Sequence, residues 1–164
     1  MTNQEHVAYP FRPRSTAALE PGQFWAVPLP NRRFACGRIV QVGGSEIPIK
    51  SRDFFGGLLD WSGDLPPSHE SIANASMLEW GVMHIRSITN LGGEILGCRP
   101  LDADGICPPV LLSSMGGDGA RILCGADSVR PANRDEWGKY PVLGFWGWDY
   151  IQRLAIHRFV PISN

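Results

Sequence analysis

The chain has 164 residues, which is the usual size of one domain and enough to bury a hydrophobic core. Its 15 basic and 16 acidic side chains give a net charge of −1, which argues against generic binding to nucleic acid or to an anionic membrane. The first 22 residues hold no apolar stretch of signal-peptide length, and no apolar run is long enough to span a bilayer. We therefore expect a cytoplasmic protein.

Glycine and proline divide the chain into short segments, with 19 glycines and 14 prolines among the 164 residues. Such frequent chain breakers leave room for few long helices. Residues 1–19 contain Pro10 and Pro13 and few packing side chains, which predicts an extended N-terminal arm. Residues 20–164 are expected to form a single β-rich domain.

The segment 23–42, QFWAVPLPNRRFACGRIVQV, predicts a β-hairpin that turns at its Pro-Asn pair. Both faces of the first strand are apolar, which indicates that both are covered. Pro28 places this strand at an edge or ends its pairing there. Only Arg32 and Arg33, at the turn, are hairpin residues that we expect to be available to a partner. Arg38 lies on an apolar strand face, so it either reaches the sheet edge or pairs with a buried carboxylate.

Four further elements are predicted downstream. Ser68 as an N-cap and an apolar pattern favour a helix over 68–80. Residues 81–101 predict a second hairpin with its bend at NLGG, and residues 108–126 a third that turns at MGGDG. Residues 153–160 favour a strand, although Asp149, Arg153 and His157 at fourfold spacing would also suit a helix face. The expected fold is mainly β (α+β): an antiparallel, strongly twisted sheet or small partly open barrel with one or two short helices.

No local pattern predicts catalysis. MGGDGAR lacks the Gly-Lys-Ser/Thr ending of a phosphate-binding loop, LDADG lacks the later ligands of a calcium loop, and no G-x-S-x-G elbow occurs. His84 stands alone in a predicted strand and suits a structural role. Carboxylates that meet only in space stay an open alternative. We expect a protein with no catalytic residue, no metal and no cofactor.

The four cysteines have no C-x-x-C spacing and lie in apolar contexts, which predicts buried free thiols. Zinc binding would need them to meet histidines through long-range folding. The cysteines are Cys36, Cys98, Cys107 and Cys124.

Acidic side chains are segregated in one stretch, because no lysine or arginine occurs between Arg52 and Arg86. Such a stretch is either a solvated surface or a patch that meets a basic partner and speeds the encounter. The second interpretation predicts a partner-binding surface made of Asp53, Asp60, Trp61, Asp64, Glu70 and Glu79.

The six tryptophans are a second unusual feature of the sequence, after the acidic stretch. Trp25 and Trp80 suit a core, whereas Trp61, Trp137, Trp146 and Trp148 lie beside glycine or polar residues. These rings either fill a small β core or anchor a binding surface. The group Trp146, Trp148 and Tyr150 suggests an alternative function, a small-molecule or carbohydrate-binding β domain.

The segment PGQFWAVPLPNRRFACGRIV, with EILGCRPL at 94–101, resembles the signature of a bacterial polymorphic-toxin immunity family, the class numbered twenty-six. The matching segments cover well under half of the chain and carry packing residues with no catalytic group. The resemblance gives structural roles to Gly22, Phe24, Pro28, Leu29, Gly37, Arg38, Gly97 and Pro100.

This resemblance implies a non-enzymatic protein that binds a cognate toxin and blocks it inside the producing cell. The acidic stretch suggests a basic toxin, for which a nuclease-type domain is the natural candidate. We expect a monomer that forms a 1:1 complex with that toxin and binds neither membrane nor nucleic acid itself.

Overall fold

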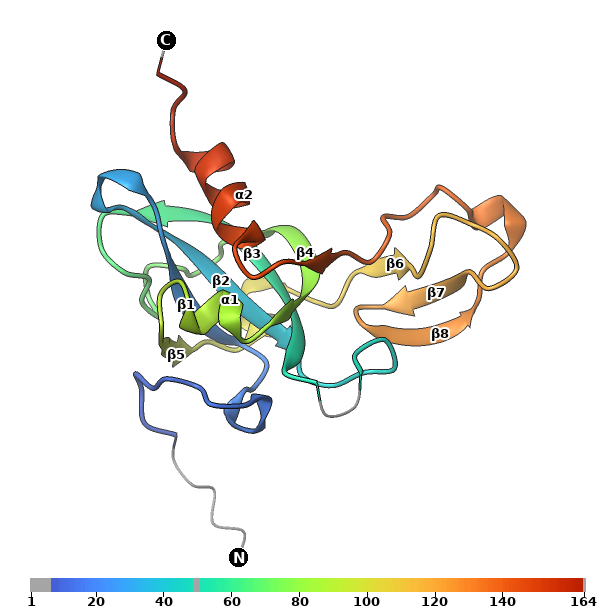
Figure 1. Cartoon of the computed structure of the whole chain (residues 1–164), viewed down its shortest axis with the longest axis horizontal. Helices are drawn as coiled ribbons and strands as arrows, with labels where there is room; N and C mark the ends of the chain where they lie inside the picture. Colours follow the sequence, from blue (N-terminus) through green and yellow to red (C-terminus); the bar gives the residue numbers. More distant parts are fainter. Residues whose placement is uncertain (1–6, 49–50, 164) are drawn as a thin grey trace, which may run out of the picture.

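The computed structural model describes residues 7–48 and 51–163, and within them the chain forms nine strands in two sheets with two α-helices (Figure 1). Neighbouring strands are antiparallel in all but one pair of the larger sheet. The predicted mainly β, antiparallel-rich fold is therefore confirmed.

The larger sheet has six strands. In chain order these are β1 (Gln23–Pro28), β2 (Phe34–Gln41), β3 (Asp53–Gly63), β4 (Met77–His84), β5 (Ile95–Cys98) and β9 (Phe145–Trp146). Their order across the sheet is β5-β1-β2-β3-β4-β9, and only the β4–β9 pair is parallel.

The smaller sheet has three strands and lies beyond one end of the larger sheet (Figure 1). Its strands, in sequence and in space, are β6 (Val110–Leu112), β7 (Arg121–Cys124) and β8 (Asp127–Pro131). The α-helices are α1 (Arg86–Thr89) and α2 (Tyr150–Phe159), and single 3₁₀ turns are η1 (Thr16–Ala18), η2 (Pro30–Arg32), η3 (Leu101–Asp104) and η4 (Arg134–Glu136).

The predicted hairpin at 23–42 is confirmed as β1 and β2, which pair from Phe24–Arg38 to Pro28–Phe34. β1 pairs with β5 only as far as Trp25. Pro28, which has no backbone N–H, therefore lies where β1 needs no ladder hydrogen bond on the side of β5. Side chains alternate across β1 as expected for a strand covered on both faces. Trp25 and Val27 pack under α2, whereas Phe24 faces the opposite side.

Both faces of the larger sheet are covered. On one face, Ile39, Phe54 and Leu58 pack against Ile151 and Ala155 of α2. On the other face, a cluster that joins the two sheets and a second cluster under the loops complete the core. The first of these consists of Val40, Ile47, Phe55, Val82, Leu111, Leu123, Ala126 and Leu143, and the second of Phe24, Cys36, Leu59, Ile72 and Ile106.

The predicted helix over 68–80 is wrong. Residues 68–75 form consecutive turns, in which the Ile72 N–H donates to the Ser68 carbonyl, and Asn74 has a left-handed backbone with φ 63°. From Met77 onwards the chain is β4 and pairs with β3. Of the apolar positions that suited a helix, Ile72 and Ala75 pack into the core from the turns and Leu78 belongs to β4, so tertiary packing and pairing override a weak local preference.

The predicted second hairpin at 81–101 is also wrong. β4 and β5 lie on opposite sides of the sheet, with β1, β2 and β3 between them. The connection folds into α1, where Ile88 is fully buried and the Ser87 carbonyl accepts a hydrogen bond from Trp25 Nε1 at 3.1 Å. The connection thus contributes to the core and to the hydrogen bonding of the buried indole, where a tight hairpin turn was expected. The third hairpin, at 108–126, is confirmed as β6 and β7.

The strand predicted for 153–160 is wrong, because these residues belong to α2 and its C-cap. Ile151, Leu154 and Ala155 face the core at helical spacing, while Arg153 and His157 are exposed. Pro161 follows the helix end and does not interrupt it.

The described part of the N-terminal arm, residues 7–19, lies against the sheet. Phe11 and Ile95 exchange backbone hydrogen bonds of 3.1 and 2.8 Å, and Leu19 is buried in the core under α2. Gln23 adds side-chain hydrogen bonds to the Tyr9 hydroxyl and the Ala18 carbonyl. Residues 1–6 of the predicted arm lie outside the described residues.

The prediction of buried free thiols holds fully for Cys36 only. All four cysteines are free, but Cys98 is half-buried and Cys107 and Cys124 are exposed. Burial raises the pKa of the Cys36 thiol far above its usual value, so this residue is an inert core side chain.

Candidate functional site

Most of the residues that carry the family resemblance meet where β1, β2 and β5 join, whereas Pro28 and Leu29 lie at the other end of β1. A Cβ on Gly22 would fall 2.6 Å from the Arg99 carbonyl oxygen, and one on Gly97 would fall 2.8 Å from the Phe24 ring. A Cβ on Gly37 would overlap the Trp25 indole. These glycines permit close approach of backbone and aromatic rings. Leu29 is buried, Pro28 ends β1 and Pro100 is the N-cap of η3.

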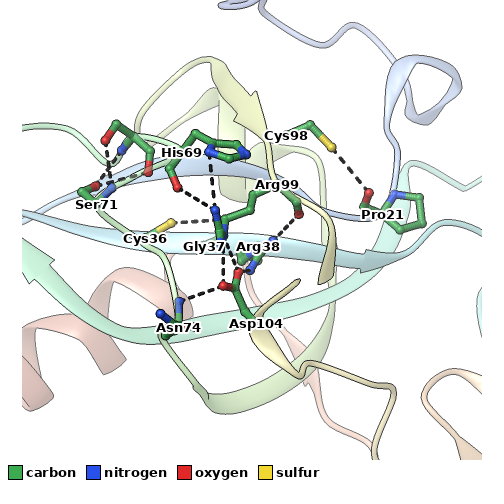
Figure 2. Close-up of polar contacts among 11 residues, drawn as sticks. Pro21, Cys36, Gly37, Arg38, His69, Ser71, Asn74, Cys98, Arg99 and Asp104 are labelled. Carbon is green, nitrogen blue, oxygen red and sulfur yellow. Dashed lines mark hydrogen bonds and ion pairs between the residues drawn. The ribbon is translucent and has the colours of Figure 1, made fainter. Parts of the chain in front are cut away.

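A buried ion pair between Arg38 and Asp104 lies at the centre of this region (Figure 2). Arg38 Nη1 lies 2.8 Å from Asp104 Oδ2, and both side chains are 0% exposed. The second guanidinium nitrogen donates to the Arg99 carbonyl. Of the two alternatives for Arg38, pairing with a buried carboxylate is the one the structure shows.

Three other groups surround the Asp104 carboxylate. The Asn74 N–H donates to Oδ1 at 2.7 Å, and Arg99 Nε lies 2.9 Å from both oxygens. Burial alone would raise the pKa of Asp104, but the hydrogen bonds from Asn74, Arg99 and Arg38 together with the Arg38 charge lower it below its usual value. The carboxylate is thus held ionised and away from solvent, which suits a structural role in fixing η3 and the 68–75 turns to β2.

The residues of the predicted acidic surface do not all lie together, because Asp53 is far along β3 from Asp60, whereas Asp60 and Glu79 both lie near Arg158. Asp53 begins β3 and Asp60 lies seven residues later, a separation of about 23 Å along an extended strand. Glu70 is exposed in the turns at 68–75. Trp61 is half-buried and packs against the cluster of Phe24 and Ile106. Asp53 therefore does not join Asp60 in one patch with Trp61 at its centre.

Two of the predicted carboxylates already have basic partners within the chain. Asp60 lies 3.3 Å from Arg158 of α2, and Asp64 lies 2.5 Å from Arg33 at the hairpin turn. All four side chains are substantially exposed, so each pair contributes little to folding stability. Their internal partners do, however, reduce the net negative field that Asp60 and Asp64 present outward.

Glu79 occupies the most distinctive position of the five carboxylates. It is exposed on β4, opposite Leu58 of β3, at a register irregularity in the β3–β4 ladder. It lines a cavity of about 170 Å³ between β4 and α2 and a larger one of about 500 Å³ on the other side.

We call the larger cavity the tryptophan groove. It is lined by Leu78, Glu79, Trp80, Leu111, Pro141, Val142, Gly144 and Trp146. The segment 141–146 builds it by crossing from one sheet to the other. The Leu143 N–H donates to Leu112 of β6 at 2.8 Å, and then the Val82 N–H of β4 donates to the Gly144 carbonyl at 2.8 Å.

Two glycines make room for the Trp146 indole in the tryptophan groove, and Phe55 supports the indole of Trp80. A Cβ on Gly81 would lie 2.5 Å from the Trp146 ring, and one on Gly144 would lie 3.0 Å from its Nε1. Trp80 stacks on buried Phe55, with ring centroids 6.0 Å apart and an angle of 6° between planes. Both indoles are half-buried, so the groove presents aromatic surface that the core already holds in place.

The segment that builds the groove carries two exposed apolar side chains, of which Val142 lines the groove and Phe145 lies outside its lining. Phe145 is 64% exposed and Val142 is 42% exposed, on the same segment as Trp146. Sequence reasoning identified Glu79 and Trp146 separately but missed Val142 and Phe145. The signal that could have found them is the run Val142–Trp146, in which apolar residues do not alternate with polar ones as they would on a strand with one solvated face.

Two further observations concern metal binding and membrane insertion. Among the described residues, no group of three or more histidine, cysteine, aspartate or glutamate side chains is placed to hold a metal ion. No helix in 7–48 or 51–163 has the length and apolar character needed to cross a membrane.

Comparisons with models of protein families, with curated proteins and with solved structures find no match to this chain. The immunity-family resemblance therefore rests on the residues quoted for it, and the site must be interpreted from its own chemistry.

Proposed function

We propose that this chain is a non-catalytic binding protein of the immunity type, which neutralises a cognate bacterial toxin domain through the tryptophan groove. The observation that carries the proposal is the juxtaposition of two fixed indoles, the exposed Val142 and a carboxylate around one cavity of about 500 Å³. Aromatic side chains held in a concave site are the usual anchors of a protein interface.

The chemistry of the groove indicates the kind of partner. Trp80, Val142 and Trp146 offer apolar surface to a protruding side chain, and Glu79 in the same lining offers a negative charge. Exposed apolar surface bordered by polar residues is typical of interaction sites. A basic toxin domain of the nuclease type, bound 1:1 in the cytoplasm of the producing cell without a cofactor, fits this combination.

The carbohydrate-binding alternative receives less support from the ring geometry. Sugars stack on flat, exposed aromatic platforms, yet Trp146 and Tyr150 meet at 59° with their centroids 5.1 Å apart. Only Trp148 of this group is largely exposed, at 44%. The three rings thus form no common plane.

Co-expression with the product of the adjacent gene tests the proposal. We expect the chain to restore growth when that product is toxic and to co-purify with it in a 1:1 complex. Val142→Ala together with Glu79→Lys should abolish both effects, because the pair removes an exposed apolar side chain and reverses the charge in the lining of the groove. The control Met115→Ala alters a side chain that is 84% exposed elsewhere and should change neither.

Continued growth arrest in the presence of the folded wild-type chain, with no complex recovered, would contradict the proposal. Saturable quenching of tryptophan fluorescence by members of a glycan panel would favour the carbohydrate-binding alternative instead.

A further inference from the structure

A second concave surface gathers arginines from three separate segments. Arg12 and Arg14 come from the N-terminal arm, Arg52 immediately precedes β3, and Arg86 begins α1. Together with His84 at the end of β4 they line a cavity of about 300 Å³, which we call the arginine pocket.

The segments that form the arginine pocket are fixed to one another by backbone contacts. The Ile85 N–H donates to the Arg52 carbonyl at 2.9 Å, which ties the start of β3 to the β4–α1 corner. The hydrogen bonds of 3.1 and 2.8 Å between Phe11 and Ile95 hold the arm beside β5, and Pro13 is buried. Arg12 Nη1 lies close to Gly93 in the loop after α1. The four arginines are thus brought together by the fold.

The charge of the arginine pocket is unbalanced within the described chain. Ion pairs within 4.0 Å engage six arginines in residues 7–48 and 51–163, and none of the four in the pocket is among them. No residue that lines the pocket is acidic. Asp53, opposite His84 in the β3–β4 register, does not line it. Like charges that converge without a counter-charge are unfavourable, and a bound anion would relieve their repulsion.

His84 adds a further donor. Its Nδ1 lies 3.1 Å from the Arg86 backbone nitrogen and accepts that N–H, so the neutral imidazole carries its proton on Nε2. The polar groups of the pocket are therefore mainly donors: guanidinium N–H groups, this ring nitrogen, and the side chains of Thr89 and Asn90.

We propose that the arginine pocket binds a small anion that carries phosphate groups, of the diphosphate class. Guanidinium groups match the oxygens of phosphate with paired hydrogen bonds. A phosphate group carries about −1.5 to −2 at neutral pH, so a diphosphate balances several guanidinium charges where one carboxylate cannot. A volume of about 300 Å³ is within the range of small-molecule sites and exceeds the needs of a single carboxylate.

Titration calorimetry with inorganic pyrophosphate tests this assignment directly. The wild-type chain should bind one pyrophosphate saturably and bind acetate undetectably. The double variant R12Q/R86Q should weaken pyrophosphate binding by about tenfold or more, since each guanidinium lost removes charge-assisted hydrogen bonds. Arg86→Lys should retain part of the affinity, because it keeps the charge but loses the planar fork.

The matched control is R134Q/R153Q, which makes the same change in net charge at two exposed arginines outside the pocket. It should leave the affinity for pyrophosphate within about twofold of wild type, as expected for screened, distant charges. An equal loss in both double variants would overturn the proposal, and so would the absence of saturable binding. Binding of a single-stranded oligonucleotide through these arginines without binding of pyrophosphate would also overturn it. None of these outcomes depends on the toxin partner.

Discussion

The buried ion pair of Arg38 and Asp104 links a strand residue to a turn 66 positions later in the chain. Taking both charges out of water is costly, and their attraction compensates only when the remaining hydrogen-bonding groups are also satisfied. Asp104 meets this condition through Arg99 and Asn74, whereas Arg38 Nε has no hydrogen-bond partner among the described residues. Loss of Asp104 would therefore leave more hydrogen-bonding groups without a partner than loss of Arg38.

Replacing Asp104 with alanine should lower the free energy of unfolding by about 3–5 kcal/mol, because it leaves a buried guanidinium without its counter-charge. Urea denaturation of the purified chain measures this change. Asp102→Ala is the matched control, since Asp102 belongs to the same η3 turn but is exposed, and it should cost less than about 1 kcal/mol. Equal stability of the two variants would show that the pair does not hold the turns at 68–75 to β2.

The sequence narrows the role of Arg38 to two alternatives, because an arginine on an apolar strand face must reach solvent or find a carboxylate. It does not identify Asp104, since LDADG also suits a solvated turn. Which alternative forms depends on η3 folding back over β2, a long-range contact that no local sequence pattern predicts.

At the scale of secondary structure, glycines on neighbouring strands determine how closely aromatic rings pack. Gly37 faces the Trp25 indole across the β1–β2 ladder, and the two residues are register partners. Trp25 is fully buried and donates to the Ser87 carbonyl, so its ring has little freedom to move. A side chain at position 37 must therefore displace the ring that anchors α1 to the sheet.

Gly37→Ala should destabilise the fold by about 1–3 kcal/mol through overpacking against Trp25. Thermal and urea denaturation, with tryptophan fluorescence as a probe of the indole environment, measure the effect. Gly119→Ala serves as control, because a Cβ there meets no heavy atom within 4 Å, and it should alter stability by less than about 1 kcal/mol. If Gly37→Ala were as stable as Gly119→Ala, the close contact with the indole would not matter to folding.

Elements with strong local signals are predictable from this sequence, and elements defined by distant pairing are not. The hairpins β1–β2 and β6–β7 have apolar runs around turn residues, and both form as expected. β4 pairs with β3, but a loop of mixed pattern separates the two strands in the sequence. The first residues of β4 therefore suited the predicted helix over 68–80 equally well. For α2, β-branched and aromatic residues favoured a strand, but the spacing of Ile151, Leu154 and Ala155 matches the face that the sheet covers.

At the scale of the whole molecule, the acidic stretch of the sequence does not become one acidic surface. β3 separates Asp53 from Asp60 by seven residues of strand, and two of the carboxylates are paired within the chain, Asp60 with Arg158 and Asp64 with Arg33. Charge segregation along a chain is thus a poor guide to charge segregation on a surface when the segment is a long strand. Glu79 is the one of these carboxylates that lines the tryptophan groove, beside aromatic groups that include Trp146 from another part of the chain.

The arrangement of the two cavities gives the molecule two chemically distinct sides. The tryptophan groove lies at the junction of the two sheets and is apolar with one carboxylate, whereas the arginine pocket lies at the α1 corner and is rich in cationic donors. A near-neutral composition conceals both features, since opposite charges on separate surfaces cancel in the net charge of −1. Composition alone could therefore reveal neither site.

The measurement that tests the central claim most directly is the rate of association between this chain and the toxin recovered by co-expression. We predict that Glu79→Lys lowers the association rate constant by about tenfold at low ionic strength and by much less in high salt, because the reversed charge repels a basic partner. Glu94→Lys makes the same charge change just before β5, at the far edge of the sheet, and should leave the rate near that of wild type. Equal association rates for the two variants would contradict binding at the tryptophan groove.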